Sequence, residues 1–282
     1  KGANLPGAQS HAGIATDGKY IYYVSGQYGT RFGGGTATGT KESWRYDIAK
    51  NKWEKFVAFP GERFAPGLVH LDGKLYCFGG AGPDRIQSTT DTYVLDLKNT
   101  SGGWKKLAPM LIPADHFGVT VFNGKIYAVG GEHDHSRGYA QHDFMIMYDP
   151  ATNKWKRLAD LPTHSSHFES SMIVRDGKIW VFGGVTDGLV KLTQVRVYDP
   201  VKNSWTMFSP LPRGSDSAVI GVKADKLWYL GGQTLDQGGI TDVYTATLPK
   251  LGTTVTLGAA KSSGSLFGAS SIKDDGTKDT LL

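Results

Sequence analysis

The chain has 282 residues, of which 39% are apolar and 20% are charged, and its formal net charge is +5. This composition is typical of a folded globular protein, and the basic residues are scattered, which argues against the basic face of a nucleic-acid-binding protein. The chain lacks an apolar stretch of the roughly 20 residues that a membrane-spanning helix requires. Glycine, with 38 residues, is enriched, which predicts many tight turns between short strands.

The predicted elements recur along the chain in units of similar length. Apolar runs that end in glycine lie at residues 20–26, 75–80, 126–131, 179–184 and 227–232, and their last glycines are 54, 51, 53 and 48 residues apart. A tyrosine follows each run, at Tyr46, Tyr93, Tyr148, Tyr198 and Tyr244. A tryptophan follows in four units, at Trp53, Trp104, Trp155 and Trp205. Three landmarks that share one spacing indicate five copies of one structural unit.

Each unit is predicted to form four antiparallel strands. In the third unit, a first strand over residues 117–122 is followed by the turn Asn123-Gly124 and by an apolar second strand that ends at Gly131. Asn-Gly and Asp-Gly turns favour hairpins, because glycine accepts a positive φ without steric cost. A variable loop leads to the third strand with its tyrosine, and a polar turn leads to the fourth strand with its tryptophan.

The Gly-Gly, tyrosine and tryptophan landmarks resemble the kelch repeat, from His11 to Tyr244. The resemblance implies an all-β, kelch-type β-propeller, in which blades of four antiparallel strands pack around an axis with aromatic rings wedged between them. We expect five blades within residues 1–257, with six as the alternative, because the fifth unit lacks its tryptophan. Either residues 1–5 or residues 253–257 are expected to complete the last blade, unless further blades belong to a longer gene product.

The two ends of the chain suggest what surrounds the propeller. Residues 258–282 are rich in serine, glycine, lysine and aspartate, and we expect a tail or a linker to a further domain beyond the C-terminus. The chain opens with Lys1 rather than methionine, which indicates a processed or truncated product. We therefore expect an extracellular or periplasmic location, with the cytoplasm as the alternative. Cys77, the only cysteine, cannot form an intrachain disulfide.

One face of the predicted propeller gathers histidines and acidic residues. The turns before the first strands and the loops after the second strands open on the same face of a propeller, so their side chains converge near its axis. A histidine precedes the first strand in three units, at His11, His116 and His167. The remaining candidates are Glu169, which follows His167 by two residues, and the loop residues Glu132, His133, His135 and His142 of the third unit.

Imidazoles and carboxylates that meet on one face suit two kinds of chemistry. They can bind a divalent transition metal, the one cofactor that these residues suggest, for which His116, His133 and His167 are the predicted ligands. They can also act as acid and base on a sugar. Arg137 and Arg213 are candidates for contacts with an anionic ligand on this face. Loop histidines that only shape the local backbone are the alternative to a functional cluster.

Two functions follow from these features as expectations. The first is a binding module that recognises a glycan or a protein on this face, without nucleic-acid binding or membrane insertion. The second is a sugar-active enzyme of the epimerase or lyase type, which uses the His/Glu residues and a divalent metal if one is bound. The resemblance allows both, because kelch propellers include protein-binding modules, carbohydrate-recognising domains and a few enzymes. A copper-radical oxidase similar to galactose oxidase is disfavoured, because Cys77 lies within a second strand, away from this face.

Overall fold

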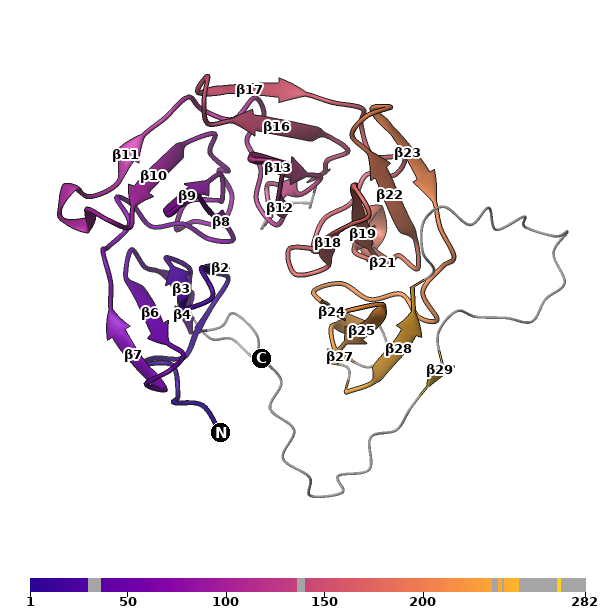
Figure 1. Cartoon of the computed structure of the whole chain (residues 1–282), viewed down its shortest axis with the longest axis horizontal. Coiled ribbons are helices and arrows are strands. Elements are labelled where there is room, and N and C mark those ends of the chain that lie inside the picture. The colour runs from indigo at the N-terminus through magenta and orange to yellow at the C-terminus, as the bar shows by residue number, and fades with distance from the viewer. Residues whose placement is uncertain (30–36, 136–139, 235–237, 240, 249–267, 270–282) are drawn as a thin grey trace, which may run out of the picture.

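The computed structural model describes residues 1–29, 37–135, 140–234, 238–239, 241–248 and 268–269. Within these residues the chain forms five four-stranded antiparallel sheets, the blades, which follow one another around a central axis (Figure 1). The first strand of each blade lies nearest the axis and the fourth lies on the outside. The prediction of an all-β propeller with four-stranded blades is confirmed.

The blades are numbered in chain order. Blade one consists of β2 (Gly13–Thr16), β3 (Tyr20–Val24), β6 (Ser43–Asp47) and β7 (Lys52–Lys55). Blade two consists of β8 (Gly67–Leu71), β9 (Lys74–Phe78), β10 (Thr92–Asp96) and β11 (Lys105–Lys106). Blade three consists of β12 (Gly118–Phe122), β13 (Lys125–Val129), β16 (Met145–Asp149) and β17 (Lys154–Arg157). Blade four consists of β18 (Met172–Arg175), β19 (Lys178–Phe182), β22 (Val195–Asp199) and β23 (Ser204–Met207). Blade five consists of β24 (Val219–Lys223), β25 (Lys226–Leu230), β28 (Val243–Thr247) and β29 (Gly268–Ala269).

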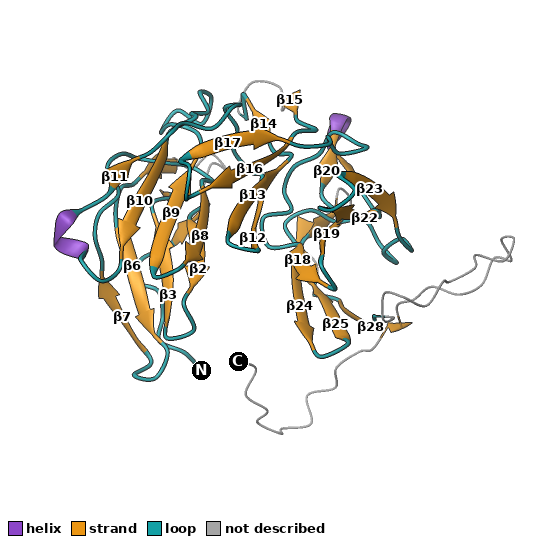
Figure 2. Ribbon diagram, turned by 45° about the horizontal axis from the view of Figure 1, so that its top comes forward, coloured by secondary structure: helices purple, strands orange, loops and turns teal. Residues whose placement is uncertain are grey.

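Shorter strands lie between the second and third strands of the blades. In blade one, β4 (Gln27–Gly29) and β5 (Ala37–Gly39) form a sheet with β1 (Gln9–Ser10). In blade three, β14 (Glu132–His133) pairs with β15 (Ala140–Gln141). Blades four and five have the corresponding pairs β20 (Val185–Thr186) with β21 (Val190–Lys191), and β26 (Gln233–Thr234) with β27 (Gly238–Gly239). Figure 2 shows β14, β15 and β20 on the same side of the ring. The loops after the second strands therefore open on one face, as predicted.

The tight turns have the geometry that their sequences predict. Asn123 and Gly124, between β12 and β13, have φ values of 47° and 69°. Positive φ at both central residues is the signature of a type I′ hairpin turn, whose twist matches that of the flanking strands. The Asp-Gly turns at residues 72–73 and 176–177 repeat this geometry.

Each repeated tryptophan joins its blade to the segment that precedes the blade. Trp155 pairs across the sheet with Tyr148, and its indole N–H donates a hydrogen bond of 3.1 Å to the carbonyl oxygen of Ala108, which follows the fourth strand of blade two. Equivalent bonds run from Trp53 to Ala3 (3.1 Å), from Trp104 to Val57 (3.5 Å) and from Trp205 to Ala159 (2.8 Å). The tryptophans thus occupy matching places in successive blades, which confirms the repeat.

The five blades form an open ring within the described residues. Four apolar clusters fill the spaces between consecutive blades, but none of them joins blade five to blade one, and Figure 1 shows these two blades at the ends of the ring. Ile14, which follows the opening glycine of β2, is 59% exposed, whereas Leu68, at the same place in β8, is 2% exposed. The difference arises because Leu68 packs against a preceding blade and Ile14 does not.

The N-terminal residues do not complete the last blade, contrary to one expectation. β29 pairs with β28 as the fourth strand of blade five, whereas Ala3 contacts Trp53 of blade one. Residues 253–257, the alternative, lie outside the described residues, as does most of the predicted tail, so a domain boundary at residue 257 stays a prediction. The helical turns of the described residues, Thr100–Gly102 and Asp187–Leu189, are too short to cross a membrane.

Candidate functional site

The leading turn of each blade, which is the turn before its first strand, belongs to a layer around the axis. His11, His116 and His167 occupy three of these turns and have left-handed φ values of 55°, 50° and 58°. Main-chain hydrogen bonds connect successive turns: the N–H groups of Ala65, His167 and Ser217 donate to the carbonyl oxygens of His11, His116 and His167, over 2.8, 2.9 and 2.8 Å. These bonds fix the turn of His11 to that of blade two, and the turn of His116 to that of His167.

The loop after the second strand of blade three is fixed to the leading turn of the same blade. The main chains of Asp115 and Glu132 exchange two hydrogen bonds, of 2.9 and 2.8 Å. Asp134 has a φ of 56°, and this tight turn brings the imidazole of His135 back to the carboxylate of Glu132, to which its Nδ1 is hydrogen-bonded. Loop and turn therefore contribute to one site.

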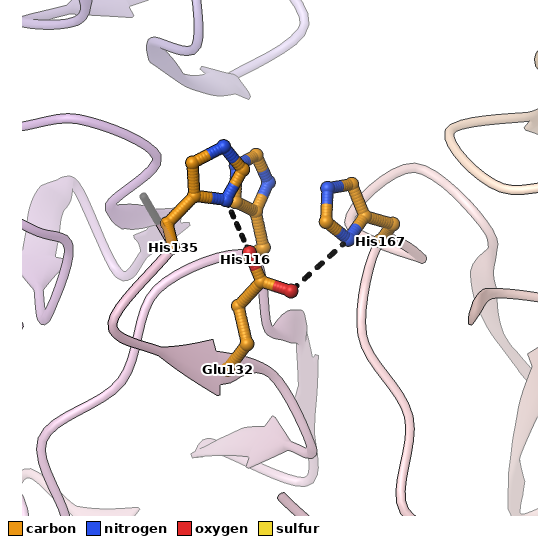
Figure 3. A group of neighbouring side chains, drawn as sticks. All are labelled: His116, Glu132, His135 and His167. Carbon is orange, nitrogen blue, oxygen red and sulfur yellow. Dashed lines mark hydrogen bonds and ion pairs between the residues drawn. The ribbon is translucent and has the colours of Figure 1, made fainter. Parts of the chain in front are cut away.

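Four of the predicted residues, His116, Glu132, His135 and His167, form a group that we call the His/Glu cluster (Figure 3). One ligand atom from each lies within 4.8 Å of the other three. The rings of His116 and His167 are stacked, with centroids 4.1 Å apart, and the ring of His135 lies 4.9 Å from that of His116. Glu132 is fully buried, and its Oε2 lies 3.6 Å from Nδ1 of His167 and accepts a hydrogen bond of 3.0 Å from Gln141 Nε2.

Glu169 fixes the orientation of His116. Nδ1 of His116 lies 2.5 Å from Oε1 of Glu169, so the ring proton of the neutral imidazole belongs on Nδ1. Nε2 of His116 is buried and has no hydrogen-bond partner among the described residues. The Nε2 lone pair of His116 is thus directed into the protein without a partner in the described part of the chain.

Burial determines the charges of the cluster. Removal from water lowers the pKa of His116 to about 3 and that of His167 to about 4, so both imidazoles are neutral at neutral pH. Burial would raise the pKa of Glu132, but the hydrogen bond from His135 and the nearby imidazoles outweigh burial and lower this pKa to about 2. Burial raises the pKa of Glu169. At neutral pH the cluster therefore combines the neutral imidazoles of His116 and His167 with the ionised carboxylate of Glu132.

The His/Glu cluster lies at the wall of a cavity of about 1310 Å³. Residues from the leading turns of all five blades line this cavity, which places it at the axis of the propeller. Charged residues of both signs contribute, including Arg85, Lys191, Glu169 and Asp216, and Lys191 is paired with Asp216. We refer to this space as the axial cavity.

Several predicted residues lie outside the cluster. Nδ1 of His133 contacts Asp134 over 3.1 Å, and its ring packs 5.0 Å from that of His142. Arg213 is paired with Asp242 over 2.8 Å. His133, His142 and Arg213 do not line the axial cavity.

The structure changes the candidate metal ligands at one position. His135, rather than His133, joins His116 and His167, and Glu132 joins them as a fourth donor. Arg137, the remaining predicted site residue, lies outside the described residues.

Two residues of the site were missed by sequence reasoning. Nη2 of Arg85 lies 2.6 Å from Nε2 of His135. Ser166 donates a hydrogen bond of 3.0 Å from Oγ to Oε2 of Glu132. Signals for both exist in the repeat, because Arg85 follows the second strand of blade two, as Glu132 does in blade three, and Ser166 immediately precedes a leading-turn histidine.

The comparisons with known proteins agree with the repeated architecture. The family model of the KLHDC2/KLHL20/DRC7 Kelch-repeats domain matches residues 32–232. The chain belongs to the kelch-repeat family. This kelch propeller is 27% identical to the Kelch repeat-containing protein At3g27220 of Arabidopsis thaliana, over 80% of this chain and 57% of that protein, and 30% identical to beta-scruin of Limulus polyphemus, over 69% of this chain and 22% of that protein.

A solved structure supports the fold. The "Structure of YjhT" matches with a TM-score of 0.66 and 21% identity, over 82% of this chain and 74% of that one. At this identity the likeness shows the propeller fold alone. The chain spans little more than half of the Arabidopsis relative and about a fifth of the scruin. Kelch-repeat domains commonly bind proteins.

Proposed function

We propose that this kelch propeller is a binding module that takes a saccharide in its axial cavity. The observation that carries the proposal is the cavity itself, with a volume of about 1310 Å³ and walls from the leading turns of all five blades. A concave site with a few convergent polar groups on rigid elements is the usual design of a small-ligand site. A flat protein surface would not need such a space.

The chemistry of the wall supports a hydroxyl-rich ligand. Lys191 is paired with Asp216, and Arg85 and Glu169 add one basic and one acidic side chain, so the wall has no large excess of either charge. Such a wall imposes no strong net charge on the ligand, yet it offers donors and acceptors to hydroxyl groups. Ile14 adds exposed apolar surface, against which the C–H face of a sugar ring can pack.

A variant that obstructs the cavity tests this proposal. Ser170 is exposed and lines the axial cavity, so the indole of Ser170→Trp should block part of the space without unfolding the blade. We expect the parent chain to bind one or more neutral or acidic sugars on a glycan array, with confirmation by calorimetry, and Ser170→Trp to lose at least about tenfold in affinity, because a change of about 1.4 kcal/mol is tenfold.

Ser101→Trp is the matched control, because Ser101 is exposed but does not line the cavity. It should bind sugars as the parent chain does, and both variants should keep the parent Tm. Absence of sugar binding on the array, or equal binding by the two variants, would contradict a saccharide site in the axial cavity.

A sugar-active enzyme of the epimerase or lyase type is a second candidate, favoured by the 2.5 Å contact between His116 and Glu169 at the cavity wall. A carboxylate and an imidazole in contact can relay a proton to or from a bound sugar. If this candidate holds, a bound saccharide should be converted, as followed by proton NMR. Glu169→Gln should then retain sugar binding and lose about 10²–10⁴-fold in rate. Binding without conversion by the parent chain would leave the binding module as the function.

A further inference from the structure

We propose that His116, Glu132, His135 and His167 form a binding site for a divalent transition metal ion, with Zn²⁺ as the best match. One ligand atom from each of the four residues lies within 4.8 Å of the other three. The inference does not depend on a saccharide ligand, because it concerns the donors of the His/Glu cluster alone. Nothing in the kelch repeat requires this combination, since blade five has Ser217 where blades three and four have His116 and His167.

The donor set selects the class of ion. Imidazole nitrogen suits zinc, copper, nickel and iron, whereas calcium and magnesium prefer oxygen donors throughout. Three imidazoles and one carboxylate supply four protein donors, the usual number around Zn²⁺. The single carboxylate, Glu132, places one negative charge at the centre of the cluster, which favours a cation there.

The environment of His116 is the strongest sign of a ligand. Its side chain is 5% exposed, and Nδ1 is occupied by Glu169. Nε2, the nitrogen that remains, is buried without a hydrogen-bond partner in the described residues. A buried hydrogen-bond acceptor without a partner lowers the stability of the folded chain, and a bound ion would supply the partner. A metal-bound histidine typically donates its other N–H to a carboxylate, which is the arrangement of His116 and Glu169.

Polar groups behind the cluster hold the carboxylate in position. Glu132 accepts hydrogen bonds from Gln141 Nε2 and Ser166 Oγ, both over 3.0 Å. The main-chain bond from His167 to His116 and the pair of bonds between Asp115 and Glu132 connect the segments that carry the donors. This second layer of contacts orients the carboxylate and the segments that carry the imidazoles.

Arg85 is the group that opposes a cation in this cluster. Its Nη2 lies 2.6 Å from Nε2 of His135, and its guanidinium lies over the ring of Phe64, 4.1 Å from the centroid. A positive charge so near the cluster repels the ion, so the site binds metal more weakly than its donors alone would allow. Removal of this charge should therefore tighten metal binding, a direction that loss of structure would not produce.

The test uses the full 282-residue chain without a histidine tag, freed of metal with a chelator and titrated with Zn²⁺ and Co²⁺. We expect one ion per chain by calorimetry and elemental analysis, with visible Co²⁺ bands typical of nitrogen and oxygen ligands.

His167→Gln removes a proposed ligand. It should weaken Zn²⁺ binding by at least about 10–100-fold, because a loss of that size is typical even of residues that only support a ligand. Arg85→Met should lower the Kd. His164→Gln is the matched control, because His164 is exposed and contacts Asp143 outside the cluster.

Glu169→Gln keeps the test decisive if His167→Gln fails to fold. It alters no proposed ligand, yet it should weaken Zn²⁺ binding by about 10–100-fold through His116. The proposal is overturned if less than one ion binds per chain, or if binding is lost equally in His164→Gln. If the chain binds metal but no sugar, the proposed saccharide function is wrong and the metal site stands. If the chain binds sugar but no metal, the metal site is wrong and the saccharide function stands.

Discussion

Replacing Trp155 with alanine is expected to lower the free energy of unfolding by about 3–5 kcal/mol. Trp155 is 9% exposed, and its ring packs edge-on against Phe78 of the preceding blade, with centroids 5.3 Å apart. The change removes this contact and also the hydrogen bond to Ala108. Urea unfolding followed by circular dichroism measures the loss.

Trp53 provides an internal comparison for this prediction. Its ring contacts Tyr23 and Tyr46 of its own blade, and its indole N–H bonds to Ala3 rather than to a preceding blade. Trp53→Ala should therefore cost clearly less than Trp155→Ala. Equal losses for the two variants would show that the tryptophans stabilise their own sheets and do not join neighbouring blades.

The second large effect is expected at Gly130, which directly follows the second strand of blade three. Gly130 has a φ of 59°, and a Cβ atom built there would lie 2.7 Å from Cζ of Phe168 and would meet the carbonyl oxygen of Ser165. Gly130→Ala should lower the free energy of unfolding by about 2–5 kcal/mol, through left-handed strain and overpacking. Ser165 and Phe168 flank the leading turn of His167, so the same variant should disturb the His/Glu cluster.

Gly177→Ala separates the two contributions. Gly177 has a φ of 72°, but a Cβ atom there would meet nothing within 4 Å. Only the strain remains, so the expected loss is about 1–2 kcal/mol. Urea unfolding of both variants should rank Gly130→Ala well below Gly177→Ala in stability, and a reversed order would contradict the steric argument.

The blade architecture could be predicted because it rests on local signals that recur. Asn123-Gly124 specifies its hairpin wherever it stands, and Trp155 recurs at a spacing that only a repeat explains. The lack of an apolar cluster between blades five and one among the described residues could not be predicted, because contacts between distant parts of the chain decide it. Ile14 looks in sequence like any residue of a buried first strand.

Sequence analysis predicted which segments form the candidate site, but not which side chains of β14 and the following turn face it. Glu132 and His133 are adjacent on β14, so their side chains project to opposite sides of the strand, and only Glu132 joins the cluster. The left-handed turn at Asp134 then returns His135 to the side of Glu132. Sequence reasoning chose His133 as a metal ligand because the sequence marks neither where this short strand ends nor that a tight turn follows it. Saccharide binding, metal binding and cellular location stay predictions.

The position of the His/Glu cluster among the blades has a consequence for where the molecule fluctuates. In an array of repeats each member contacts only its neighbours, so a member that packs on both sides opens less readily than one that packs on one side. The His/Glu cluster is built from blades three and four, and within the described residues each of them packs against a blade on either side. The cluster therefore lies on a stretch of the chain that is stabilised from both directions.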